Sequence, residues 1–257
     1  MTLFLYSFVI SQVTLDEGTP VKGLTSVVMT SALIDTAKIL DIACGLAMNG
    51  VGYQCTTAIS ETTVWEPIRL SSIKPMTMID IDGPTICGIG SDGISCAPNV
   101  FRPAWILQTT PPELAGLVFQ YIQVSQQNVC GLSDTGDLYC AKIGGAFRLM
   151  FSGIASFTIS IDSICMVRTK YGRIICSKTF FVKPPQWIQL EGVGTKLKMK
   201  DTTLCLFNTD SKLSCSDINK ESWTTGATSS DVADFSIHKY LEFFRCDGWI
   251  RHWICPK

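Results

Sequence analysis

The stretch Val129-Cys130-Gly131-Leu132-Ser133-Asp134-Thr135-Gly136-Asp137-Leu138-Tyr139-Cys140 decides the fold. Two cysteines flank a polar turn, in which Gly adopts a positive φ freely and Asp hydrogen-bonds to nearby backbone. Folding the arms back at the turn brings Cys130 opposite Cys140. Cβ atoms of an antiparallel pair lie about 4.5–5.5 Å apart, close to the ~3.5–4.5 Å of a disulfide. The stretch therefore predicts a β-hairpin closed at its base by a disulfide.

The same unit occurs six times and uses all twelve cysteines. The predicted pairs are Cys44–Cys55, Cys87–Cys96, Cys130–Cys140, Cys165–Cys176, Cys205–Cys215 and Cys246–Cys255. Their first cysteines follow one another at intervals of 43, 43, 35, 40 and 41 residues. A period between about 20 and 50 residues indicates a repeat architecture.

Each repeat carries two further apolar segments beside the hairpin. Runs that alternate with period two precede the hairpins at 76–81, 117–124, 157–161 and 196–199. Aromatic-led segments follow them at 65–70, 105–107, 147–150, 187–190 and Trp223. β-Branched and aromatic residues at period two predict strands, so each repeat of ~40 residues contains four. This predicts an all-β fold: a single six-bladed β-propeller over residues 1–257, with one hairpin disulfide in each four-stranded blade.

The two ends of the chain predict how the ring closes. Only Pro256-Lys257 follow Cys255, so the last repeat lacks its aromatic segment, whereas residues 3–10 supply one at the N-terminus. We expect this N-terminal strand to complete the last blade. The alternative is a signal segment, although it has neither a basic n-region nor a small-residue cleavage site.

The remaining segments are expected to be connections. Residues 12–36 are expected to form a loop or a short helix. Gly192–Gly194, Pro111-Pro112 and Pro184-Pro185 are expected between strands, because Gly and Pro interrupt regular structure.

Composition excludes several classes of protein. The net charge is −1 and the 21 basic residues are scattered, which argues against a nucleic-acid partner. The densest basic run, Lys196–Lys200, alternates with apolar residues and is interpreted as the solvent face of a strand. Twelve paired cysteines indicate an oxidising compartment, hence an extracellular or secreted protein. No apolar stretch reaches the ~18 residues that a membrane span needs.

Three motifs suggest chemistry but are better explained by turns. Gly88–Gly93 fits the dinucleotide-binding pattern, which needs a following helix, whereas a strand is expected here. Asp134-Thr135-Gly136 resembles half of an aspartic protease site, but that mechanism needs two carboxylates and no second such motif exists. Asp80-Ile81-Asp82-Gly83 could offer oxygens to Ca²⁺, but too few for its six to eight ligands, so a turn is favoured.

The only histidines, His238 and His252, cannot assemble a zinc set or a Cys-His nucleophile when every cysteine is paired. His238 is expected on the solvent face of a strand. We therefore predict no enzyme activity, no cofactor and no metal.

The binding candidates are aromatic. Trp65, Trp105, Trp187 and Trp223 either stack on sugars or pack between blades, and packing is favoured because an indole contributes a large apolar area. The last hairpin carries Trp249, Arg251, His252 and Trp253 where other repeats have small turn residues. Such residues suit a sugar face or a protein hot spot, or else pack at the closure of the ring. Arg102 and Glu113, on long loops, are weaker candidates.

The motif Cys-Gly-Leu/Ile at Cys44, Cys87 and Cys130 resembles the repeats of the regulator-of-chromosome-condensation superfamily, especially the cysteine-paired extracellular repeats of crinkly-type plant receptors. The Trp-led strands are similar to tectonin repeats of secreted propeller lectins. The last three repeats have Met166, Leu206 and Asp247 in place of the motif's Gly. The tectonin resemblance implies glycan binding through loops between blades.

Two functions follow. The chain is predicted to be a non-catalytic extracellular interaction module, a structural or protein-binding component of an assembly or particle. Its partner would be a protein of that assembly. The alternative is a tectonin-like lectin that binds cell-surface or particle glycans, with repeated weak sites adding avidity.

Overall fold

The computed structural model describes residues 13–15, 19–21, 24–35, 38–47, 52–56, 66–69, 75–100, 103–108, 116–180, 186–200, 202–208, 212–218, 224–228, 232–237, 242–246 and 249–253. All helical or strand structure among these residues is β-strand, as the sequence predicted. The chain divides into two compact units, Met1–Gly131 with Cys140–Arg148 and Leu132–Tyr139 with Leu149–Lys257.

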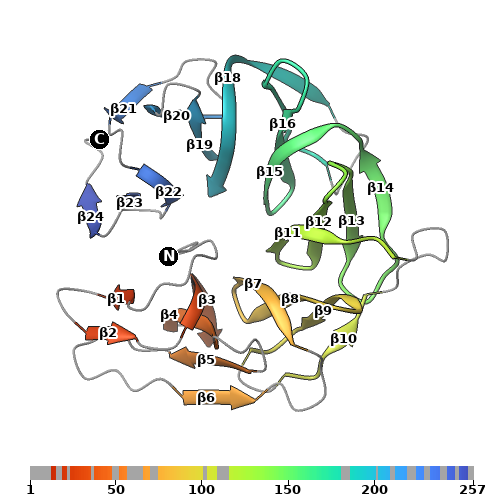
Figure 1. Cartoon of the computed structure of the whole chain (residues 1–257), viewed down its shortest axis with the longest axis vertical. Helices are drawn as coiled ribbons and strands as arrows, with labels where there is room; N and C mark the ends of the chain where they lie inside the picture. The colour runs from red at the N-terminus through yellow and green to blue at the C-terminus, as the bar shows by residue number, and fades with distance from the viewer. Residues whose placement is uncertain are drawn as a thin grey trace. The chain divides into compact units, whose positions relative to one another are not determined.

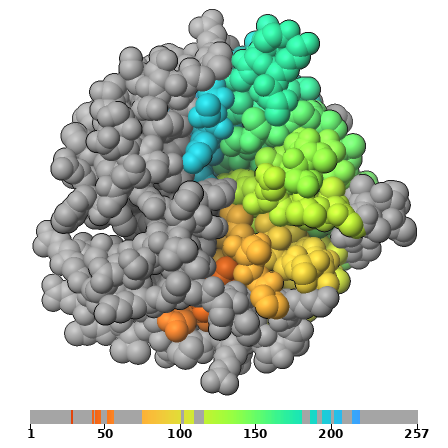
Figure 2. All heavy atoms as spheres, in the orientation of Figure 1, coloured from red at the N-terminus to blue at the C-terminus, as the bar shows by residue number. Residues whose placement is uncertain are grey.

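The first unit contains two four-stranded antiparallel sheets, each built from neighbours in chain order (Figure 1). One sheet consists of β3 (Leu24–Asp35), β4 (Lys38–Ala47), β5 (Gly52–Thr56) and β6 (Glu66–Arg69). The other consists of β7 (Met76–Asp82), β8 (Thr85–Gly90), β9 (Gly93–Ala97) and β10 (Ile106–Leu107). Figure 2 shows the described atoms of this second sheet, in orange and yellow, closely packed on one face.

The expectation of a loop or helix over residues 12–36 is wrong. β1 (Val13–Leu15) and β2 (Thr19–Val21) form a two-stranded sheet, and most of the remainder is β3. β3 pairs with β4 along nearly its whole length. Its β-branched residues, including Val27 and Val28, suit a strand better than a helix.

A third four-stranded sheet, through which the division between the units passes, has the order β11 (Phe119–Ser125), β12 (Asn128–Ser133), β13 (Leu138–Lys142) and β14 (Arg148–Phe151). In the second and third of these sheets the alternating strand comes first, whereas in the first sheet β3 takes that place; in all three the stapled hairpin supplies the middle pair and the aromatic-led segment supplies the last strand. This is the strand order that the repeats predicted.

The second unit contains a seven-stranded sheet that holds two repeats. Its strands are β15 (Ile154–Ser160), β16 (Ser163–Arg168), β17 (Arg173–Ser177), β18 (Trp187–Lys200), β19 (Thr203–Asn208), β20 (Lys212–Asp217) and β21 (Thr224–Thr228). β18 is shared: Trp187 to Val193 pairs with β17, and Gly194 to Lys200 pairs with β19. The prediction that Gly192–Gly194 form a connection is therefore wrong. The register shifts on both sides of this segment, so the strand changes partner without ending.

The last repeat forms a sheet of β22 (Val232–Ile237), β23 (Glu242–Cys246) and β24 (Trp249–Trp253). In the register of β23 and β24, Cys246 lies opposite Trp249 and not opposite a cysteine. Cys255, residues 3–10, Pro111-Pro112 and Pro184-Pro185 lie outside the described residues, so the sixth disulfide, the closing strand and those two connections stay predictions.

Five disulfides close the hairpins of the other repeats: Cys44–Cys55, Cys87–Cys96, Cys130–Cys140, Cys165–Cys176 and Cys205–Cys215. For four of them the strand register places the cysteines directly opposite each other. Each of these five disulfides therefore lies within one hairpin and links no two repeats.

Neighbouring sheets contact each other through their first strands. In the first unit β7 lies between β3 and β11, and in the second β18 lies between β15 and β22 (Figure 1). One core cluster, which includes Val28, Tyr53 and Ile79, lies in the first unit, and another, which includes Val167 and Leu204, lies in the second.

Glycine and large side chains alternate at one packing position, which explains the Cys-Gly motif. A Cβ at Gly88 would collide with the Met76 side chain, and one at Gly131 with Phe119. In the fifth repeat the sizes are exchanged, because Leu206 replaces the motif glycine and a Cβ at Gly194 would collide with Leu206. The loss of the glycine is thus compensated on the facing strand.

Candidate interaction surface

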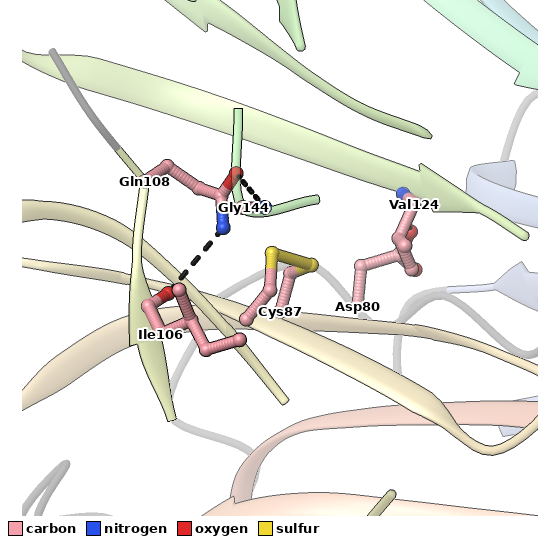
Figure 3. The surroundings of a disulfide bond; sticks show 7 residues. Asp80, Cys87, Ile106, Gln108, Val124 and Gly144 are labelled. Atoms are coloured by element: carbon pink, nitrogen blue, oxygen red, sulfur yellow. Dashed lines mark hydrogen bonds between the residues drawn. A yellow bond between two sulfur atoms is a disulfide. The ribbon is translucent and has the colours of Figure 1, made fainter. Parts of the chain in front are cut away.

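The pair Asp80 and Asp82 connects neighbouring strands. Both lie on β7, so the turn begins only at Gly83. Asp80 is buried, and its Oδ2 accepts a hydrogen bond from the Val124 N–H of β11 at 2.7 Å (Figure 3). Asp82 Oδ2 accepts one from the Gln126 N–H at 2.8 Å. Both carboxylates accept hydrogen bonds from backbone amides, so their described contacts favour a structural role.

The second unit repeats this arrangement with hydroxyls. The Leu197 N–H donates to Ser156 Oγ at 3.3 Å, and the Met199 N–H donates to Thr158 Oγ1 at 2.9 Å. In both units two side chains, spaced by two residues on one first strand, accept hydrogen bonds from alternate backbone amides of the next repeat: Val124 on β11 and Gln126 just after it in the first unit, Leu197 and Met199 on β18 in the second.

A second bridge joins the outer parts of neighbouring sheets in the first unit. Gln108 is buried, its Oε1 accepts a hydrogen bond from the Gly144 N–H at 3.0 Å, and its Nε2 donates to the Ile106 carbonyl at 3.4 Å (Figure 3). Tyr53 forms a third link, since its hydroxyl donates to the Val100 carbonyl at 2.8 Å. Burial raises the pKa of Tyr53.

The interpretation of Lys196–Lys200 as a solvent face is wrong for Lys198. Lys196 is exposed, but the Lys198 side chain is only 4% exposed. Strand β18 contacts both β15 and β22, so the alternation of its residues does not separate a solvent-exposed face from a buried one.

The motifs that resemble enzyme sites occupy turns. Asp134-Thr135-Gly136 lies between β12 and β13, and the turn satisfies its own polar groups: the Asp137 N–H donates to Ser133 Oγ at 2.9 Å, and Thr135 Oγ1 donates to Asp137 Oδ2 at 3.1 Å. Gly136 has φ +81°, a conformation that favours glycine. Gly88–Gly93 runs from β8 into β9, so a strand follows, as predicted.

Two of the four repeat tryptophans can be placed, and both pack. Trp105 meets Tyr53 edge to face, with ring centroids 6.0 Å apart. Trp187 meets Phe151 at 4.9 Å and Phe180 at 5.8 Å, although its side chain stays 37% exposed. Trp65 and Trp223 lie outside the described residues.

The residues Trp249, Arg251, His252 and Trp253 belong to strand β24, the second arm of the last hairpin. Trp249 pairs with Cys246, Arg251 with Phe244, His252 with Phe243 and Trp253 with Glu242. His238, Arg102 and Glu113 lie outside the described residues.

Apolar side chains are exposed on the outermost strands. β10 and β14 are the edge strands of their sheets. Leu107 on β10 is 55% exposed and Leu149 on β14 is 53% exposed. An edge strand offers unpaired backbone groups as well as side chains, so each of these strands has the chemistry of an interaction surface.

The end of the β16–β17 hairpin was predicted only as a turn and not as a candidate site. Tyr171 there is 66% exposed with φ +76°, and Lys170 and Arg173 approach its ring. A signal was present, because Arg168, Lys170 and Arg173 place three cations within six residues where other hairpins use small polar residues.

The described part of the chain contains no group of three or more His, Cys, Asp or Glu positioned to hold a metal ion. The described residues include no helix that is long and apolar enough to cross a membrane.

Comparison with solved structures identifies the fold. Hsv2p of Kluyveromyces lactis matches with TM-score 0.59 and 7% identity, over 82% of this chain and 70% of its own. A chain of the nidogen/laminin complex matches with TM-score 0.52 and 14% identity, over 87% and 92%. Prp20p of Saccharomyces cerevisiae matches with TM-score 0.51 and 10% identity, over 76% and 63%. This chain has a β-propeller-type fold.

No protein-family model matches the chain. No curated protein matches it either.

Proposed function

We propose that this chain is a non-catalytic interaction module, a structural or protein-binding component of an extracellular assembly or particle. The observation that carries the proposal is the exposure of Leu107 and Leu149 on the edge strands β10 and β14. Both strands belong to disulfide-closed sheets, so a partner meets a surface that is already ordered, which lowers the entropy cost of binding.

The disulfides support an extracellular setting. Five hairpin disulfides suit an oxidising compartment, since cytosolic thiols are kept reduced. One structural neighbour was solved in the nidogen/laminin complex, which is an assembly of proteins.

A binding role also agrees with the motifs that could have indicated catalysis. Asp80 binds a backbone amide, and Asp134-Thr135-Gly136 forms a turn that bonds to itself. Propellers generally serve as scaffolds for binding, although fold alone does not fix function.

The alternative is a tectonin-like lectin. Trp105 and Trp187 contact aromatic neighbours, which favours packing at those positions. The lectin proposal therefore depends on Trp249 and Trp253 of β24. Together with Arg251 and His252, they are the candidate binding residues.

We further propose that the six repeats form one domain, closed into a ring by residues 3–10 beside the last sheet. The sheet of the last repeat has three strands among the described residues, whereas the sheets of the first three repeats have four each. Deletion of residues 1–11 should lower the thermal unfolding temperature by several degrees if the strand completes a blade. An unchanged temperature would argue for a dispensable leader.

The test of function compares edge-strand variants with matched controls. Leu107→Asp and Leu149→Asp place a charge on β10 and β14, whereas Val118→Asp and Ile161→Asp alter exposed apolar residues elsewhere in the same units. Partners would be identified by cross-linking on the native source, and their affinities measured with purified protein. We expect an edge-strand variant to weaken binding at least about tenfold, as for a hot-spot residue.

The same proteins would be screened on a glycan array beside Trp249→Ala/Trp253→Ala. Saturable glycan binding that this double variant abolishes, with no protein partner found, would replace the proposal by the lectin alternative. Equal loss of a protein partner from the edge-strand and control variants would contradict the proposed surface.

A further inference from the structure

Tyr171 adopts a backbone conformation that its side chain does not favour. Its φ is +76° and that of Gly172 is +59°, so two successive residues at the end of the hairpin have positive φ. Such turns prefer Asn-Gly, because bulky residues clash with their own backbone there. Strained residues of this kind gather at functional sites. A tyrosine at this position therefore needs a reason other than turn formation.

Two cations pack on the Tyr171 ring. Lys170 Nζ lies 5.1 Å and Arg173 Cζ 5.5 Å from the ring centroid, within the ~6 Å range of cation–π contacts. The exposed Arg168 lies at the end of β16 in the same hairpin. Among the described residues, none of these three cations contacts a carboxylate. The hairpin end thus presents three positive charges close together in the sequence.

Neighbouring elements hold the hairpin end in place. The Thr169 N–H and Oγ1 both donate to the Gly153 carbonyl, at 2.9 and 3.1 Å, in the turn before β15. The Gly194 N–H of β18 donates to the Gly172 carbonyl at 3.2 Å. The disulfide Cys165–Cys176 closes the other end of the hairpin. The charged residues therefore lie on an ordered hairpin, which lowers the entropy cost of binding a partner.

We propose that this end of the β16–β17 hairpin, formed by Arg168, Lys170, Tyr171 and Arg173, binds an acidic peptide segment of a protein partner. The inference rests on the proposed function and specifies that the contacting segment of the partner is acidic. Arginine forks match carboxylates, and Tyr and Arg are enriched in protein hot spots. Three cations at one hairpin end suit a short run of Asp and Glu. A polyanion such as a sulfated glycan or nucleic acid is usually bound along an extended basic stripe.

The test uses the full-length oxidised protein and a fluorescein-labelled hexaglutamate peptide, with binding measured by fluorescence anisotropy. We expect Lys170→Gln/Arg173→Gln to weaken binding about five- to thirtyfold, as for two exposed ion pairs. Lys142→Gln/Lys178→Gln removes two other exposed cations and should leave affinity within about twofold. Binding should also vanish near 1 M salt, where the screening length is about 3 Å.

A further variant guards against misfolding. Tyr171→Asn suits a positive φ and should fold at least as stably as the wild type, yet it should weaken peptide binding because the cations lose the ring that gathers them.

Equal affinity in Lys170→Gln/Arg173→Gln and in the control pair would overturn the proposal. So would binding of a heparin hexasaccharide in preference to hexaglutamate, which would assign the cations to a glycan. Because the probe is synthetic, failure here leaves the edge-strand test of the proposed function unaffected, and failure of that test leaves this one intact.

Discussion

The Asp80 carboxylate binds an amide that belongs to a different sheet. Its Oδ2 lies 2.7 Å from the Val124 nitrogen in a buried environment, whereas the equivalent bond from Asp82 to Gln126 is exposed. Water can replace the exposed bond but not the buried one. Two carboxylates in one strand therefore contribute unequally to stability.

Asp80→Ala should lower the free energy of unfolding by about 1–3 kcal/mol, because it leaves the Val124 N–H buried without its acceptor. Asp82→Ala, its matched control, should cost less than about 1 kcal/mol. Urea unfolding measures both values. Equal losses would show that burial does not distinguish the two bonds.

Tyr53 makes stability depend on alkaline pH. Burial raises its pKa in the folded protein above the ordinary value of 10.0, which the unfolded chain retains. The group's contribution is therefore fully present below about pH 10 and is lost as the pH rises from there towards the folded pKa.

Tyr53→Phe should lower stability by about 0.5–1.5 kcal/mol at neutral pH, since it removes the hydrogen bond to Val100. It should also flatten the decline in stability between about pH 9 and 11. Urea midpoints across that range, compared with those of exposed Tyr171→Phe, check the sign. A decline as steep in Tyr53→Phe as in the wild type would contradict the assignment.

At the level of strands, the first strand of a repeat packs on the hairpin through side chains of complementary size at facing positions. Met76 faces Gly88 and Phe119 faces Gly131, whereas Gly194 faces Leu206. One large and one minimal side chain fill the space in either arrangement. Two large ones would overpack it, and two small ones would leave a cavity.

This exchange predicts a favourable coupling between two substitutions. Gly194→Met and Leu206→Gly should each destabilise by about 2–4 kcal/mol, one through overpacking and the other through a cavity. The double variant recreates the arrangement of Met76 and Gly88, so it should lose at least about 1 kcal/mol less than the sum. A double-mutant cycle in urea measures the coupling. Strict additivity would mean that the two positions do not share this space.

Sequence periodicity predicts the hairpins, their disulfides and the strand order well, because cysteine spacing and period-two alternation are local properties. It fails where tertiary contacts decide. Lys198 looks solvent-facing until β18 is seen to have strands on both sides. Gly192–Gly194 look like a break, although the strand continues with a new partner. The hairpin end at Tyr171 was predicted only as a turn, because the positive φ of Tyr171 and the cations on its ring depend on the folded backbone.

At the scale of the molecule, the five described disulfides each stabilise one repeat by itself, and the described polar bridges connect neighbouring repeats within a unit. Cys87→Ala/Cys96→Ala should cost about 2.5–3 kcal/mol, the loop-closure entropy of a segment of about ten residues. Differential scanning calorimetry under oxidising conditions gives the loss. The stability of Cys205→Ala/Cys215→Ala, which opens a loop of similar length, should fall by a similar amount. A loss near zero would indicate residual structure in the reduced, unfolded chain.

Because each disulfide joins cysteines only 9 to 11 positions apart, oxidation can follow the order of synthesis. Closing a loop of forty residues instead of ten costs roughly 1.2 kcal/mol more, so the correct thiol is favoured from the first encounter over one in the next repeat. The same locality bears on evolution. Duplicating or deleting one repeat adds or removes a complete pair of cysteines, so the number of repeats can change without leaving a reactive thiol behind.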